Sequence, residues 1–169
     1  MMSLQGEIVA EINLPEGYSP GLDGVIAGLS AISKVDPQGD ELIYYGYKVS
    51  ELCELSNFEE VSYLLLYGKL PTSVELSDFQ KKLIANRNVN KEILEILCKQ
   101  PKDAHYMDIL RSGASLLAHQ HKDCNGISHD GELEKSIELI AKMPTILAAR
   151  VRSLNGKTPV APKADLGHA

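Results

Sequence analysis

Residues 42–72 read LIYYGYKVSELCELSNFEEVSYLLLYGKLPT and carry the sharpest local signals in this chain. The run Leu42–Tyr45 favours a strand, and Gly46 breaks it. The stretch from Lys48 to Leu55 then has room for about two helical turns. We therefore expect a short strand followed by a short helix.

A second helix is predicted to begin at Ser56, because Glu59 follows three residues later and the pair forms a capping box. The apolar residues that follow are too numerous for a solvated helix, so this helix must be buried. Gly68 supplies its C-terminal stop. Thr72 and Glu75 repeat the capping box, and the two capped helices should pack together.

The remaining chain predicts further helices and one small sheet. Residues 1–20 contain Pro15, Gly17 and Pro20 and are interpreted as a flexible arm. Val25–Val35 and Leu42–Tyr45 flank the turn sequence Asp36–Asp40 and should form a β-hairpin, the only sheet. Helices are expected at about residues 73–85, 91–100, 104–119 and 133–154. The fold class is therefore mainly α and multihelical.

Each predicted helix has an apolar face. Asn90 should cap the helix at residues 91–100, and Pro144 should kink the last one. The faces expected to be buried are Leu76, Phe79, Leu83 and Ile84; Ile93, Leu94, Leu97 and Cys98; and Leu133, Ile137, Ile140, Pro144, Leu147, Val151 and Leu154.

The helix at residues 104–119 has apolar or small residues on two sides. One stripe contains Met107, Leu110, Ala114 and Leu117, and Gly113 lies on the other. A glycine inside a helix costs roughly 1 kcal/mol relative to alanine, and close approach of another helix usually compensates. Periodicity alone leaves open whether that neighbour belongs to the same chain or to a second copy.

Composition bounds the function classes. The 169 residues are 44% apolar, enough for a sizeable core, and the net charge of −6 argues against a nucleic-acid partner. The sequence contains no run of 18 apolar residues, so no membrane span is predicted. Its first residues lack the basic segment followed by an apolar core that is typical of a leader. Three dispersed cysteines suggest reduced thiols and a cytoplasmic location: Cys53, Cys98 and Cys124.

One glycine pattern and one group of possible metal ligands occur in the sequence. Gly21, Gly24 and Gly28 lack the strand, helix and Lys-Ser/Thr context of a phosphate loop, so a turn is favoured. A zinc site needs four ligands, and their count is met by His119, His121, Cys124 and His129. Their spacing is not that of a structural zinc site, and histidines at a helix end can instead complement the helix dipole.

No catalytic residue stands out. Ser115 is not within G-x-S-x-G, and no strand precedes it. His105 lies at a predicted helix start, which favours a structural role over acid–base chemistry. We therefore predict no catalytic, cofactor-binding or metal-binding residue, and no permanently bound cofactor.

Several motifs occur in an order that resembles the N-terminal part of the citrate synthase family, which includes 2-methylcitrate synthases. The match begins near Gly21-Leu22-Asp23-Gly24-Val25 and includes Ile32-Ser33-x-Val35-Asp36, the run from Phe58 to Thr72, and His105-x-Met107-Asp108-x-Leu110-Arg111. Tyr106 stands where most members carry proline. The resemblance implies that residues 21–169 form an incomplete, citrate-synthase-like large helical domain.

The resemblance also implies a reaction. Family members condense acetyl-CoA or propionyl-CoA with oxaloacetate, using two histidines and an aspartate for acid–base work and enol stabilisation. The histidines lie in Gly-Pro-Leu-His-Gly and Gly-Phe-Gly-His-Arg segments, and neither string occurs here. His168 precedes those segments and is not expected to be catalytic. Members pair the helix corresponding to residues 104–119 with its copy across a dimer axis.

Two hypotheses follow. In the first, the chain is the structural N-terminal part of a citrate or 2-methylcitrate synthase and is inactive alone. In the second, it is a non-catalytic helical module for dimerisation or other interactions, derived from the same fold. The choice between acetyl-CoA and propionyl-CoA depends on residues that this sequence does not contain.

Overall fold

The structure is a computed structural model that describes residues 24–26, 28, 30–36, 39, 41–121 and 125–168. The chain divides into two units, residues 1–31 and residues 32–169. The predicted arm at residues 1–20 lies outside the described residues, as does Gly21, the first glycine of the pattern compared above with a phosphate loop. Gly24 lies in a turn with a φ of 73°, as predicted.

A three-stranded antiparallel sheet precedes the helices, in the order β1-β2-β3. β1 (Ser33–Asp36) and β2 (Glu41–Tyr44) confirm the predicted hairpin, although β1 is much shorter than expected. β3 (Tyr47–Lys48) was not predicted. The chain turns into it through Tyr45 and Gly46, whose φ values of 45° and 90° are those of the tight turns that match strand twist.

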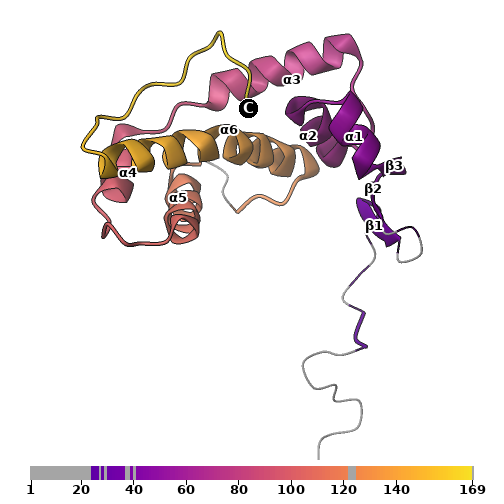
Figure 1. Cartoon of the computed structure of the whole chain (residues 1–169), viewed down its shortest axis with the longest axis horizontal. Coiled ribbons are helices and arrows are strands. Elements are labelled where there is room, and N and C mark those ends of the chain that lie inside the picture. The colour runs from indigo at the N-terminus through magenta and orange to yellow at the C-terminus, as the bar shows by residue number, and fades with distance from the viewer. Residues whose placement is uncertain are drawn as a thin grey trace, which may run out of the picture. The chain divides into compact units, whose positions relative to one another are not determined.

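Helices make up most of the described chain, which confirms the mainly α fold class. α6 is the central helix, and α3, α4 and α5 each pack against it (Figure 1). The chain after α6 has neither helix nor strand among its described residues. The helices are α1 (Val49–Leu55), α2 (Phe58–Tyr67), α3 (Ser73–Asn86), α4 (Lys91–Cys98), α5 (Tyr106–Gln120) and α6 (His129–Leu154).

Capping side chains set most helix starts, and one prediction is wrong by a residue. α2 is capped by Asn57 and Glu60, each bonded to the other's backbone N–H at 2.9 Å. Ser56 instead follows the last residue of α1, and its N–H donates to the Leu52 carbonyl. Glu59 is unavailable to a capping box because it is buried and accepts a bond from the backbone of His168.

The other caps agree with the sequence. Thr72 and Glu75 form the predicted capping box of α3, and Asn90 caps α4. Gly68 ends α2 with a φ of 75°. α6 begins one turn earlier than predicted, because the hydroxyl of Ser128 accepts from the third backbone N–H of the helix.

The core consists of two apolar clusters on different halves of α6. The first joins α2, α3 and the first half of α6, and its buried members are Tyr63, Phe79, Leu83, Ile137 and Ala141. The second joins α4, α5 and the second half of α6, and its buried members are Ile93, Leu97, Ile109, Leu117 and Ile146.

The predicted seam of α6 is only partly confirmed: Leu133, Ile140, Leu147 and Leu154 are half-buried, but Pro144 is exposed. Ile137 is buried as expected, but Val151 is 40% exposed. The buried residues of the second half are instead Ile146, Ala149 and Arg150. The stripe shifts because the two halves of the helix face different partners. Pro144 lies inside α6, and the kink there stays a prediction.

Candidate functional site

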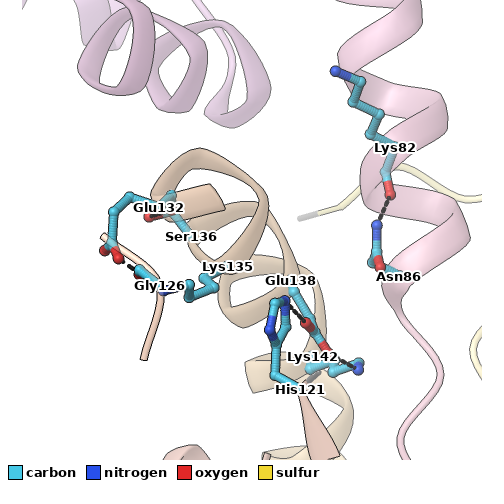
Figure 2. Close-up of polar contacts among 9 residues, drawn as sticks. All are labelled: Lys82, Asn86, His121, Gly126, Glu132, Lys135, Ser136, Glu138 and Lys142. Carbon is cyan, nitrogen blue, oxygen red and sulfur yellow. Dashed lines mark hydrogen bonds and ion pairs between the residues drawn. The ribbon is translucent and has the colours of Figure 1, made fainter. Parts of the chain in front are cut away.

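One polar cluster joins the end of α5 to the middle of α6. His121 follows the last residue of α5, and its Nε2 lies 3.7 Å from Oε2 of Glu138 (Figure 2). Lys142, one turn further along α6, donates to the other oxygen of the same carboxylate. All three side chains are less than a quarter exposed. One carboxylate thus holds two basic groups.

A second group of contacts fixes the start of α6. The ammonium of Lys135 donates to the Gly126 carbonyl and lies 2.8 Å from the Glu132 carboxylate. The hydroxyl of Ser136 donates to the backbone carbonyl of Glu132 at 2.8 Å (Figure 2). These bonds hold the preceding loop against the helix, which is a structural role.

Between these groups and α3 lies a cavity of about 270 Å³. Lys82 and Asn86 contribute to it from α3, and His121 contributes from the end of α5. Glu134, Ile137 and Glu138 complete it from α6. Lys82 and His121 face two glutamates across it, and the histidine is engaged by the carboxylate of Glu138. The arrangement fits a crosslink between helices better than an activated nucleophile or base.

The four candidate zinc ligands do not form a described site. Cys124 lies outside the described residues. His119 and His129 are exposed, and His121 faces Glu138. In the described ranges, no three histidine, cysteine or acidic side chains are grouped in a way that could hold a metal ion.

The two catalytic candidates have the structural positions that the sequence favoured. His105 caps α5, and its Nδ1 accepts from the Met107 backbone N–H at 3.2 Å. Ser115 is an exposed residue in the middle of α5. Neither lines any of the cavities described here.

Sequence reasoning missed Arg150, which is only 1% exposed. Its guanidinium donates to the carbonyls of Cys98 at 3.1 Å and Gln100 at 3.0 Å, and also to that of Pro101. These carbonyls lie at the C-terminal end of α4, where the helix dipole favours a cation. The only sequence signal was an arginine within the apolar stretch after Pro144.

The residues of the predicted dimer helix divide between two faces of α5. Gly113 and Leu117 are buried within the chain. A β-carbon at Gly113 would lie 3.0 Å from Ile146 and 3.4 Å from Leu97, so the close approach expected there is made by the chain's own helices. Met107 is 63% exposed, and Leu110 and Ala114 are half-buried.

A longer groove of about 470 Å³ runs between α4, α6 and the chain that follows α6. Leu94 and Cys98 line it from α4, and the Thr158–Pro162 segment forms another wall. The Cys98 thiol donates to the Ala149 carbonyl at 3.6 Å. This groove is largely apolar, and the ionisable side chains that line it are Lys91, Glu95 and Cys98, all from α4.

Comparison with known proteins accounts for the helical arrangement. A family model described as "Citrate synthase, C-terminal domain" matches residues 21–169. The chain belongs to the citrate synthase family. It is 38% identical over 149 residues to a 2-methylcitrate synthase of Mycobacterium tuberculosis and 36% identical over 152 residues to a citrate/2-methylcitrate synthase of Bacillus subtilis.

The solved structures agree with this family membership. The crystal structure of citrate synthase from Thermotoga maritima MSB8 matches with a TM-score of 0.75 and 39% sequence identity. That match covers 88% of this chain and 38% of the Thermotoga chain. The citrate-synthase-like helical fold predicted from the motif order is therefore confirmed.

The chain spans about two-fifths of the length of the citrate synthase relatives that it matches. The match covers 88% of this chain and 37% of the Mycobacterium enzyme, and 90% of this chain and 41% of the Bacillus enzyme. Within the part that the structure describes, no helix is both long and apolar enough to cross a membrane.

Proposed function

We propose that this chain is the structural N-terminal part of a citrate synthase-type enzyme. The complete enzyme would transfer the acyl group of acetyl-CoA or propionyl-CoA to oxaloacetate, giving citrate or 2-methylcitrate and free CoA. The observation that supports this proposal is how much of each chain aligns. Nearly all of this chain aligns with named synthases, yet it aligns with only about two-fifths of their length.

The position within the enzyme follows from the motifs. The description of the family model names a C-terminal domain, and the matched residues contain the motifs that the resemblance assigns to the earlier part. The later Gly-Pro-Leu-His-Gly and Gly-Phe-Gly-His-Arg segments do not occur in the sequence. The chain would therefore supply large-domain helices, and the histidines that act on the substrates would come from elsewhere.

The contacts made by the described polar side chains support the proposal that the chain is inactive alone. Condensation requires a base for the methyl proton and donors for the developing enol oxygen. The described acidic and basic clusters are instead committed to each other or to backbone groups. Under this proposal, acyl-CoA is a substrate of the complete enzyme, and no cofactor is permanently bound.

The proposal includes a homodimer through the outer face of α5. Met107, Leu110 and Ala114 leave that face partly apolar, and a hollow of about 90 Å³ between α5 and α6 continues it. Leu139, 37% exposed, lines that hollow from α6. Met107, Leu110 and Ala114 would meet their copies, whereas Gly113 and Leu117 would support α5 from behind.

A cytoplasmic location is also part of the proposal, on the basis of the free thiols of Cys53 and Cys98.

A specific observation favours the second hypothesis, a non-catalytic interaction module. The two core clusters are well buried, with Leu83 of the first at 0% exposure and Leu97 of the second at 1%. Such a core could fold without further chain, and the outer face of α5 could then bind a second copy.

An activity assay separates the two. The purified chain is incubated with oxaloacetate and acetyl-CoA or propionyl-CoA, and free CoA is measured by chromatography, because thiol reagents would also react with the protein's cysteines. The proposal expects no product from the chain alone and product when a complementary C-terminal part of a related citrate synthase is added. Product from the chain alone would overturn it.

Sedimentation of the same preparation tests the alternative. A stable dimer that gives no activity with any complementary part favours the interaction module. A chain that gains activity on complementation rules that module out as its main role. Reactions without oxaloacetate control for hydrolysis of the thioester.

A further inference from the structure

Two buried charges of opposite sign hold one irregular segment, Lys163–His168. Arg87, 8% exposed at the end of α3, donates through Nη1 to the Lys163 carbonyl at 3.0 Å and the Leu166 carbonyl at 2.8 Å. Glu59, 8% exposed on α2, accepts from the His168 backbone N–H at 2.8 Å. The cation thus binds the segment's carbonyls and the anion binds its N–H.

The position of Arg87 is itself fixed by α6. The hydroxyl of Thr145 donates to the Arg87 carbonyl at 2.9 Å. Beneath the segment lies a cavity of about 210 Å³, whose floor on α6 is formed by Ala141, Pro144, Thr145 and Ala148. Segment Lys163–His168 therefore lies as a strap across a hollow in the surface of α6.

The imidazole of His168 closes one end of this strap. It stacks on Phe58 of α2, with ring centroids 5.0 Å apart and planes 17° apart. The ring also makes a hydrogen bond to the backbone of Ile140. Pro144 has no N–H, so the Ile140 carbonyl four residues earlier lacks its helical donor. His168 supplies that missing donor.

The other ring nitrogen of His168 has no such partner. Nδ1 is buried and has no hydrogen-bond partner among the described residues. A neutral imidazole can leave Nδ1 as a bare acceptor, but protonation would make it a donor with nothing to bind. Leaving a buried donor unsatisfied is costly, so the docked position disfavours the imidazolium.

The surroundings of His168 shift its pKa in both directions. Burial, followed by the positive charge of Arg87, lowers the pKa of His168 below its ordinary value of 6.5. Glu59 and the bond to Ile140 raise the pKa and only partly offset this. Where α6 faces the strap across the hollow, its four lining residues carry no charge. The strap's own Lys163 and Asp165 are exposed.

We propose that residues Lys163–His168 form a pH-sensitive strap, docked on α2, α3 and α6 while His168 is neutral and released when His168 is protonated. The sign follows from linkage. Well above pH 6.5 the His168 ring is neutral in both the released and the docked state, and docking is complete. As the pH falls below 6.5, the released strap binds the proton first, so docking weakens until the docked histidine also titrates. This proposal is independent of the enzymatic one.

Amide hydrogen exchange of the 169-residue chain between pH 5.5 and 8, corrected for intrinsic rates, tests the proposal. The His168 N–H reports docking directly, because Glu59 accepts its bond. Its protection should be constant above about pH 7 and should fall below that, by up to about tenfold for each unit by which docking lowers the pKa. Constant protection over the whole range, or none at pH 8, would overturn the proposal.

A matched pair of variants assigns the effect to one ring. His168→Phe keeps a ring to stack on Phe58 but cannot be protonated, so its strap protection should not change with pH. His119→Phe, at an exposed position on α5, should keep the parent's pH dependence. A pH dependence that persists in His168→Phe would overturn the proposal. Titration of the His168 ring by NMR gives a second readout, and a pKa at or above 6.5 would also overturn it.

Discussion

Gly113→Leu tests where the close contact of α5 lies. Even the first added atom would stand 3.0 Å from Cδ1 of Ile146 and 3.4 Å from Cδ1 of Leu97, and three further carbons have to follow it. Overpacking of a core typically costs 1–3 kcal/mol, and confinement by α4 and α6 together favours a cost of about 3 kcal/mol. Loss of the glycine returns about 1 kcal/mol of helix propensity. The net loss of unfolding free energy should be about 2 kcal/mol.

Urea denaturation followed by circular dichroism measures this loss, and a fall in melting temperature of roughly 4–8 °C should accompany it. Ser115→Leu is the matched control, because it adds the same side chain at an exposed position of the same helix and should change stability little. If Gly113 faced a second copy instead, Gly113→Leu would leave the monomer stable and weaken only the dimer. Unchanged stability of the variant would therefore refute the packing described here.

Three further predictions concern charges and caps. Arg150→Leu leaves three carbonyls at the end of α4 without their donor and should cost about 1–3 kcal/mol in urea unfolding, whereas Arg111→Leu, 80% exposed, should cost little. Asn57→Ala should lower stability by about 1 kcal/mol through the lost cap, and Ser56→Ala should not; equal losses would contradict the observed start of α2. Bonds from Lys69 and from Thr72 lower the pKa of Glu75 to about 2. Glu75 therefore stabilises the fold above about pH 4.5, and this contribution is lost as the pH falls towards 2. Glu75→Gln should flatten that part of the stability profile.

The features that the sequence predicted depend on residues close together in the chain. The box of Thr72 and Glu75 and the stop at Gly68 each involve residues within one helical turn, so their chemistry can be recognised without a tertiary structure. The start of α2 was misplaced because Ser56 and Asn57 are both good caps with a glutamate three residues on. Tertiary structure decided between them, since Glu59 is used by the segment near His168.

The buried face of α6 shows where periodicity fails. A regular apolar repeat predicts one buried stripe only if a helix faces one partner along its whole length. Ile137 packs with α2 and α3, whereas Ile146 packs with α4 and α5. The stripe therefore moves round the helix between them, and Val151 becomes exposed. No pattern within α6 records which helices lie beside each half.

The buried charges were the least predictable residues, and they bear most directly on function. Arg150 binds carbonyls about 50 residues away, and Glu59 binds an N–H 109 residues away. A sequence shows such charges. It does not show the backbone groups whose hydrogen bonds offset the cost of burying them. Acid–base catalysis needs a perturbed group that faces a substrate, whereas Glu59, Arg87 and Arg150 are all spent on backbone groups of their own chain. Their use supports the scaffold role proposed for this chain.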